Sequence, residues 1–109
     1  MAEREQARAV AERFGRNLRR IRKREDLSQE RLGLRASLHR TEIGKLEKGE
    51  RVCRIDTLIR IAGAMAVPPG ELLDGIVWVV PSPAPDGAFA FGTTSIPSSP
   101  RPDADEAAG

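Results

Sequence analysis

The chain has 109 residues, enough for one small domain with short additional elements, since domains typically hold about 100–150 residues. Its composition is 39% hydrophobic, with one Trp, three Phe and no Tyr, so we expect a modest aliphatic core with little room for a buried substrate cleft. The net charge of +2 conceals an asymmetry. Residues 1–62 carry 17 Lys and Arg against 10 Asp and Glu, a net charge of +7, whereas residues 63–109 carry 1 against 6, a net charge of −5. The first half therefore favours a polyanionic partner; on charge alone, a solvated Arg-rich helical face is the alternative.

The cysteine content and the motifs present bear on compartment and chemistry. One Cys cannot form a disulfide within the chain, which is typical of a reducing compartment. The opening MAEREQARAV is charged, and no apolar run is long enough for a signal peptide or a membrane span. We therefore expect a cytoplasmic protein that has no membrane partner. The sequence contains no phosphate-binding loop, no recognisable pair of catalytic carboxylates and no Ser, His and Asp in the order of a catalytic triad. We therefore expect that the protein is not an enzyme and has no catalytic residue. We also expect no cofactor and no metal site.

The first predicted element is a helix over residues 3–25. Gly15 costs about 1 kcal/mol relative to Ala within a helix, but it does not interrupt the pattern. The apolar positions recur at helical spacing: Ala7, Ala11, Phe14, Leu18 and Ile21.

A second helix is predicted to open at Ser28, a favourable N-cap residue. Leu27 before the cap and Leu32 within the helix are placed to form a hydrophobic staple. Leu32 and Ala36 then face one side, and Leu38 closes a tight turn into the next helix.

A third helix is predicted from about His39 to Lys48, with Gly49 as its stop. Ile43 and Leu46 form its buried face, and its other face is polar. A short helix held by a few apolar residues, with a polar outer face, is suited to the major groove of DNA.

A fourth helix is predicted over residues 55–66 and a fifth, short one after Pro68-Pro69, where Pro69 suits the first helical position. The expected inward residues of the fourth helix are Leu58, Ile59, Ala62 and Met65, and the fifth carries Leu72 and Leu73. The predicted fold class is therefore all-α, with five helices forming a domain over residues 1–75.

The sequence pattern changes after this domain. Ile76–Val80 is β-branched and aromatic, Ala88–Gly92 alternates with period two, and the turn-rich PSPAPDG lies between them. We predict a β-hairpin over residues 76–92, and a disordered tail over residues 93–109 from its Pro, Ser and acidic bias. Two strands alone are marginally stable in water, so the hairpin needs a covering surface, either its own helices or a second subunit.

Several segments at fixed spacing resemble the Cro/phage-repressor (XRE) family of helix-turn-helix DNA-binding domains. They are NLRRIRKRE, LSQERL, RTEIGKLEKGER and LIRIAGAMAVPPGELL, within about residues 14–73. The family usually has a small hydroxyl residue where His39 stands, often Pro where Cys53 stands, and often Ser or Thr where Pro68 stands. The resemblance implies a lambda-repressor-like fold and sequence-specific transcriptional regulation through double-stranded DNA. A protein-interaction module of the same fold, of the antitoxin or bridging-coactivator type, is the alternative function.

The expected base contacts lie on the exposed face of the third helix. Arg40 and Thr41 are near its start, Lys45 is one turn further on, and the resemblance places base contacts at these three positions. Arg40 can bind guanine O6 and N7 with both arms of its guanidinium, and Thr41 offers a methyl and a hydroxyl group. Glu42 either accepts a hydrogen bond from cytosine N4 or only repels phosphates.

The expected phosphate contacts flank that face. Gln29 matches a family phosphate-contact position at a helix N-terminus, where an anion is favoured. His39 either takes the same role for the third helix or acts as its cap. Lys48, Arg51 and Arg54 follow in a loop expected to lie over the DNA backbone.

The last expectations concern internal support and assembly. The resemblance implies that Arg22 pairs with Glu47, and a phosphate contact is the other role considered for Arg22. One such domain recognises only a few base pairs, so we expect a homodimer on a palindromic or pseudopalindromic site and no small-molecule ligand. The expected dimerisation residues are Leu72, Leu73, Ile76, Trp78 and Val80.

Overall fold

The computed structural model describes residues 3–80 and 87–92, in two compact units, Met1–Leu73 and Asp74–Gly109. The predicted turn PSPAPDG lies mostly outside the described residues, and the predicted tail lies wholly outside them. The first unit contains the α-helices α1 (Glu3–Arg24), α2 (Gln29–Ala36), α3 (Arg40–Glu47) and α4 (Ile55–Met65), followed by the 3₁₀ helix η1 (Pro69–Leu73). The second contains the strands β1 (Ile76–Val79) and β2 (Ala88–Phe91).

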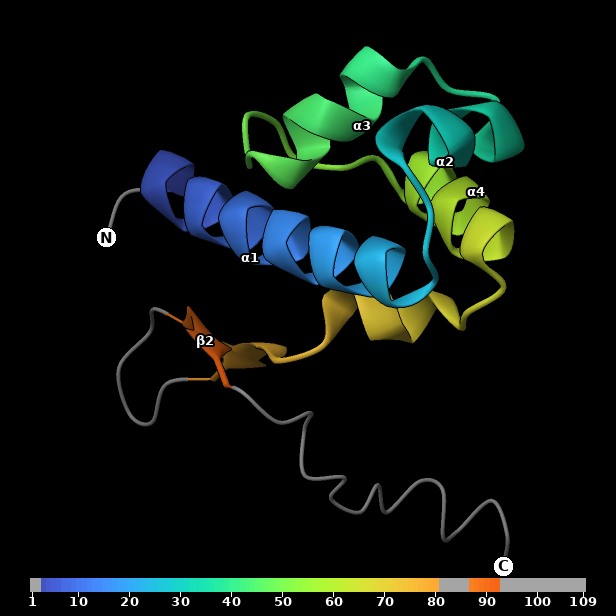
Figure 1. Ribbon diagram of the computed structural model, residues 1–109. Coiled ribbons are helices and arrows are strands. Elements are labelled where there is room, and N and C mark those ends of the chain that lie inside the picture. The colour runs from blue at the N-terminus through green and yellow to red at the C-terminus, as the bar shows by residue number, and fades with distance from the viewer. Residues whose placement is uncertain (1–2, 81–86, 93–109) are drawn as a thin grey trace, which may run out of the picture. The chain divides into compact units, whose positions relative to one another are not determined.

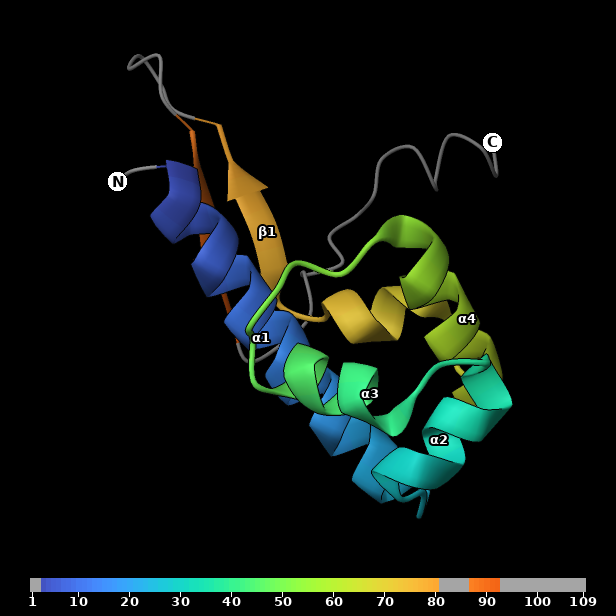
Figure 2. The same cartoon turned by 90° about the horizontal axis from the view of Figure 1, so that it is seen from above.

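The first unit is arranged around the long helix α1. Helix α3 packs on one side of α1 and η1 on the other, while α2 contacts both α3 and α4 (Figures 1 and 2). Asn17 is fully buried and donates from Nδ2 to the carbonyl oxygen of Leu72 at 3.0 Å, which links α1 to η1. The largest apolar side chains that are almost completely buried are Leu18, Ile21, Leu32, Ile43, Leu46, Ile61 and Leu72.

The prediction of a fifth α-helix is wrong: the described residues contain four α-helices, and the fifth element is a 3₁₀ turn. The N–H of Glu71 donates to the carbonyl of Pro68 at 3.0 Å, an i to i−3 bond. Five residues before a turn at Gly75 are too few for a regular α-helix, and single turns of this length commonly adopt the tighter 3₁₀ form.

The predicted inward face of α4 is also wrong at one position. Ile59 is 54% exposed, whereas Ile61 is fully buried. Residues two apart in a helix point about 200° from each other, so only one of these two side chains can face the core. The face of α4 that points to the core is determined by the two elements that pack on this helix, α2 and η1. Their positions cannot be read from the sequence of α4 alone.

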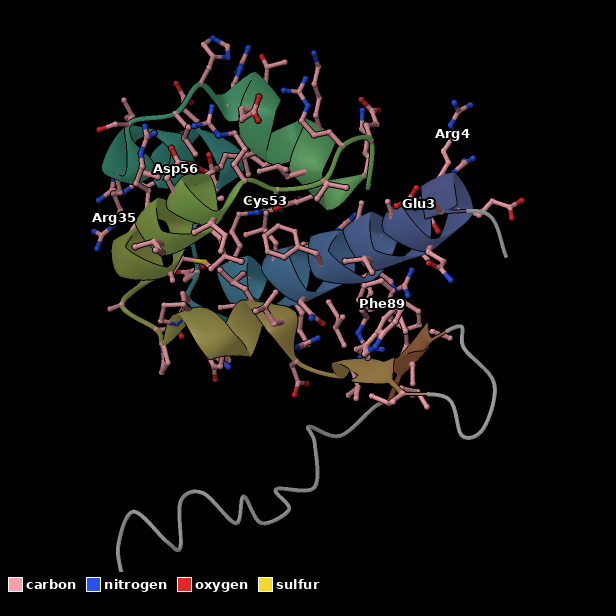
Figure 3. All side chains as sticks on the ribbon, turned by 180° about the vertical axis from the view of Figure 1, so that it is seen from behind. Glu3, Arg4, Arg35, Cys53, Asp56 and Phe89 are labelled. Atoms are coloured by element: carbon pink, nitrogen blue, oxygen red, sulfur yellow. The ribbon has the colours of Figure 1, made fainter. Side chains whose placement is uncertain are left out.

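Two arginines cross-link the ends of α2 and α4. Arg60 of α4 donates to the carbonyl oxygens of Ala36 at 3.1 Å and Ser37 at 2.6 Å, at the end of α2. In return, Arg35 of α2, labelled in Figure 3, donates to the carbonyl of Ala64 at 2.8 Å. The last carbonyls of a helix have no hydrogen-bond partner within it and attract cations. Each arginine therefore supplies hydrogen-bond donors to free carbonyl oxygens at the end of the other helix. The exchange fixes α2 against the body of the unit.

The second unit contains the predicted hairpin, with each strand one residue shorter than expected. The strands are antiparallel, with Ile76 opposite Phe91 and Trp78 opposite Phe89. The rings of Trp78 and Phe89 meet edge to face, with centroids 5.1 Å apart. Directly opposed residues share a face, so one face of the hairpin carries these four large side chains and the other carries Val and Ala.

One residue expected at a subunit interface is buried instead. Leu72 is fully inaccessible to solvent because it fills the core between α1 and α4, so its assignment to dimerisation is wrong. The other residues of that set differ: Leu73 is 43% exposed, Trp78 50% and Val80 73%, and Ile76 is partly buried.

Candidate nucleic-acid interface

Two local features shape the α2–turn–α3 segment: the N-cap of α2 at Ser28 and a close backbone contact at Gly33. The Oγ of Ser28 accepts from the N–H of Arg31 at 2.9 Å, which confirms the predicted N-cap of α2. Ser37 ends α2 in the left-handed conformation, with φ at 61°. A Cβ on Gly33 would lie 2.6 Å from the carbonyl oxygen of Leu38, so the turn can fold back over α2 only where that side chain is missing.

His39 starts helix α3 as its N-cap. Its Nδ1 accepts from the N–H of Thr41 at 3.0 Å and lies 2.7 Å from the Thr41 hydroxyl. This is the bond that a small hydroxyl residue usually makes at a helix start, here made by a ring nitrogen. An accepting Nδ1 requires the tautomer with its proton on Nε2, which leaves the exposed Nε2–H as a donor. Capping is thus observed for His39, and a phosphate contact stays a prediction.

Three of the four predicted base-contact residues, Arg40, Thr41 and Lys45, meet at one surface depression, which we call the recognition hollow. Its volume is about 350 Å³, and Arg40 and Thr41 are exposed at its border. The hollow is lined by Gln29, Arg40, Thr41, Gly44, Lys45, Lys48 and Glu50. The sequence did not indicate two of these residues, Gly44 and Glu50. The i, i+4 spacing from Arg40 could have revealed Gly44, because it places both residues on the same helix face.

Glu42 does not line this hollow. Its carboxylate accepts from Arg51 at 2.9 and 3.3 Å, so the two charges neutralise each other beside α3. Arg54, also expected to bind phosphate, pairs with Asp56 at 3.1 Å, and both side chains are mostly exposed. Exposed ion pairs of this kind contribute about 0–1 kcal/mol to stability. Arg51 and Arg54 can therefore exchange their carboxylate partners for a phosphate.

A buried ionic network joins the C-terminal end of α3 to α1 and to the start of α2. Arg22 donates from Nε to Glu47 at 2.5 Å and from Nη2 at 3.1 Å, and the two side chains are only 10% and 5% exposed. Arg22 also donates to the carbonyl of Leu27 at 2.7 Å, before α2. Gln29 donates from Nε2 to Glu47 at 3.0 Å. The side chain of Gln29, expected on a phosphate, is therefore engaged in joining the start of α2 to the end of α3.

Comparison with known proteins bears directly on this segment. A model of the helix-turn-helix family matches residues 18–72, half of the chain. The chain belongs to this family, of the Cro/phage-repressor type. It is 40% identical over 62 residues to the control protein C.BamHI of Bacillus amyloliquefaciens, covering 56% of this chain and 76% of that protein.

Solved structures give the same assignment for the fold of this helix-turn-helix protein. The restriction-modification controller protein C.AhdI from Aeromonas hydrophila is 34% identical, with a TM-score of 0.57 over 59% of this chain and 97% of that one. The clp gene regulator ClgR from C. glutamicum is 19% identical and shares the fold, with a TM-score of 0.57 over 59% of this chain and 83% of that one. The N-terminal part of α1 (residues 3–17) and the hairpin lie outside the matched family segment.

Cys53 stands in the loop of the helix-turn-helix protein that leads into α4 (Figure 3). Burial raises the pKa of its thiol to about 11, and the nearby carboxylates of Glu42 and Asp56 add to the shift. The thiol also donates to the carbonyl of Arg54 at 3.3 Å. A thiol with so high a pKa is protonated at neutral pH and is a poor nucleophile.

In residues 3–80 and 87–92, no group of three or more His, Cys, Asp or Glu is placed to hold a metal ion. Within the same part of the chain, no helix has the length and apolar character needed to cross a membrane.

Proposed function

We propose that this protein is a sequence-specific DNA-binding transcriptional regulator. The observation that carries the proposal is the recognition hollow, where Arg40, Thr41 and Lys45 face outward together from α3. A guanidinium, a hydroxyl with its methyl group, and an ammonium are groups that recognise base edges in the major groove. The charge of +7 on residues 1–62 favours the approach of DNA.

The relatives support a regulatory role. C.BamHI is named a control protein and C.AhdI a restriction-modification controller protein. The role proposed here is a cytoplasmic one, based on binding rather than catalysis, and it calls for no cofactor or small-molecule ligand.

Selection of bound duplexes from a random DNA pool tests this function with the purified full chain. A regulator should enrich one sequence motif, and its affinity should fall steeply as salt is raised. A protein-interaction module of the same fold would enrich no motif, and that result would overturn the proposal.

We expect Arg40 to determine base identity. In the Arg40→Ala variant, affinity for the selected site should fall by about 1–3 kcal/mol, and selection should lose its preference at one base pair per half-site. Arg54→Ala is the matched control, because it removes the same charge from a loop position and should weaken all sequences alike. Repeating the selection with both variants measures the difference. An unchanged motif for Arg40→Ala would show that the base-reading surface lies elsewhere.

We further infer that the regulator acts as a homodimer on two half-sites, since specific affinity usually requires two such helices about 34–36 Å apart. The described hairpin residues offer a surface for this contact. They include no charged or polar side chain, and Trp78, Val79 and Val80 are about half or more exposed. A two-stranded sheet also leaves one edge of each strand unpaired, which an identical strand can fill.

A truncation after Asp74 separates the possible interfaces, because the preceding unit has its own core. We expect sedimentation to show folded monomers that bind a palindromic site more weakly than the full chain does. The full-length Val80→Lys variant should weaken dimerisation in the same way without removing the hairpin. A truncated protein that stays fully dimeric would move the interface to the helices, where Ile55 and Ile59 are exposed on α4.

A further inference from the structure

A second charged hollow lies between the N-terminal part of α1 and the loop that follows α3. Its volume is about 460 Å³. Four cations line it, Arg4 and Arg8 from α1 with Lys48 and Arg51 from the loop, against the two carboxylates of Glu12 and Glu50. We call this depression the flanking hollow. Its lining has an excess of two positive charges, and α1 contributes to it from residues outside the matched family segment.

The flanking hollow continues the recognition hollow. Lys48 and Glu50 line both depressions, so the surface is unbroken from the base-contact residues of α3 to the start of α1. At the start of α1, Arg4 points to the side of the helix on which α3 lies, whereas Glu3 points away from the body of the unit (Figure 3). A duplex seated on α3 therefore has a cationic surface beside it.

The wall of the flanking hollow is held in place by a close backbone contact. Gly49 adopts a φ of +72°, and a Cβ there would lie 2.7 and 2.8 Å from Cγ and Cα of Glu12. The loop after α3 thus lies directly on α1. This contact fixes how closely the backbone that carries the arginines of α1 approaches the loop that carries Lys48 and Arg51.

The cations are available to a ligand. In the described part of the chain, the side chains of Arg4 and Lys48 form no ion pair. Arg8 pairs with Glu12 at 3.3 Å, but their side chains are 76% and 45% exposed, so the pair contributes little stability. Arg51 pairs with Glu42, which does not line the hollow, and these two side chains are less exposed, at 46% and 29%.

We infer that the flanking hollow binds backbone phosphates of DNA beyond the base pairs that α3 contacts. The inference rests on the proposed function, because it takes its ligand from the DNA seated on the recognition hollow. A duplex carries one negative charge per about 1.7 Å of its axis, so DNA that extends past α3 presents phosphates to the next cationic surface. The extended α1 thereby lengthens the footprint beyond that of the matched family segment.

The test is the salt dependence of binding to a duplex of arbitrary sequence, measured with the full chain. Each lost phosphate contact lowers the slope of log affinity against log salt by about 0.9, so Arg4→Ala/Arg8→Ala should lower it by nearly two. Arg20→Ala/Arg24→Ala is the matched control. It removes two charges from the same helix, at side chains that bond to Asn17 and to Glu71 of η1, and its slope should stay close to that of the parent.

A variant that is expected to raise affinity, rather than lower it, strengthens the test. Glu50→Gln removes a carboxylate shared by both hollows and should raise affinity for the same duplex. Thermal melts of all three variants confirm that each is folded, since the substituted side chains are exposed. Equal slopes for the two double variants would overturn the inference and leave the proposed function intact. A parent chain that shows no salt-dependent DNA binding would overturn the proposed function itself.

Discussion

Replacing Glu47 by Ala should lower the free energy of unfolding by about 3–5 kcal/mol, the cost of leaving a buried charge without its partner. Glu47 is only 5% exposed and accepts from both Arg22 and Gln29. It also lies at the C-terminal end of α3, where the helix dipole disfavours a negative charge. The guanidinium of Arg22 offsets that penalty, and without Glu47 this guanidinium would remain buried with a single carbonyl partner.

Urea or thermal unfolding of matched variants measures this effect. Glu71→Ala is the control, because Glu71 pairs with Arg24 at 3.0 Å between side chains that are 49% and 41% exposed. Such an exposed pair contributes little stability, so the control should melt close to the parent. The double variant Arg22→Met/Glu47→Met should regain part of the loss, since neither charge is then stranded.

The same series decides the role of Arg22. A structural role requires Arg22→Met alone to lower the melting temperature, by roughly 4–8 °C per kcal/mol for a domain of this size. If Arg22→Met melts like the parent but binds DNA poorly, Arg22 is a phosphate contact and the buried pair contributes little to folding.

The sequence was a good guide wherever local physics decides the outcome. Helical spacing gave the bounds of α1, α3 and α4 and the start of α2 to within one or two residues, because buried and exposed side chains alternate with the helix period. The cap at Ser28 followed from its side-chain chemistry alone. The strands of the hairpin were found through β-branched and aromatic residues between turn signals.

The errors arose where packing between distant elements decides. Ile59 and Ile61 are both apolar and both fit a helix, and only the positions of α2 and η1 select the one that is buried. Leu72 and Leu73 present the same difficulty, since one fills the core and the other is exposed. The flanking hollow was missed for a similar reason. It joins residues near position 4 to residues near position 50, and the spacing of charges along the chain does not indicate that approach.

A last consequence of packing is the requirement for glycine at position 15, where α1 crosses the end of α3. A Cβ on Gly15 would lie 2.4 Å from the carbonyl oxygen of Leu46 and 2.5 Å from that of Glu47. Both contacts are with backbone, so no side chain can turn away to relieve them. From the sequence of α1 alone, this glycine only weakens the helix by about 1 kcal/mol relative to Ala.

Gly15→Ala should therefore lower the free energy of unfolding by about 1–3 kcal/mol, the usual cost of overpacking, in spite of the better helix propensity of Ala. Gly63→Ala is the matched control within α4, because a Cβ there meets no atom within 4 Å. It should raise stability by up to about 1 kcal/mol. Chemical unfolding of the two variants should thus give shifts of opposite sign. Since the displaced carbonyls belong to the end of α3, the helix proposed to contact base pairs, Gly15→Ala should also weaken DNA binding, whereas Gly63→Ala should not. If Gly15→Ala were stabilised as Gly63→Ala is, a Cβ at position 15 would fit, and α1 could not lie as close to the end of α3 as it does in the structure.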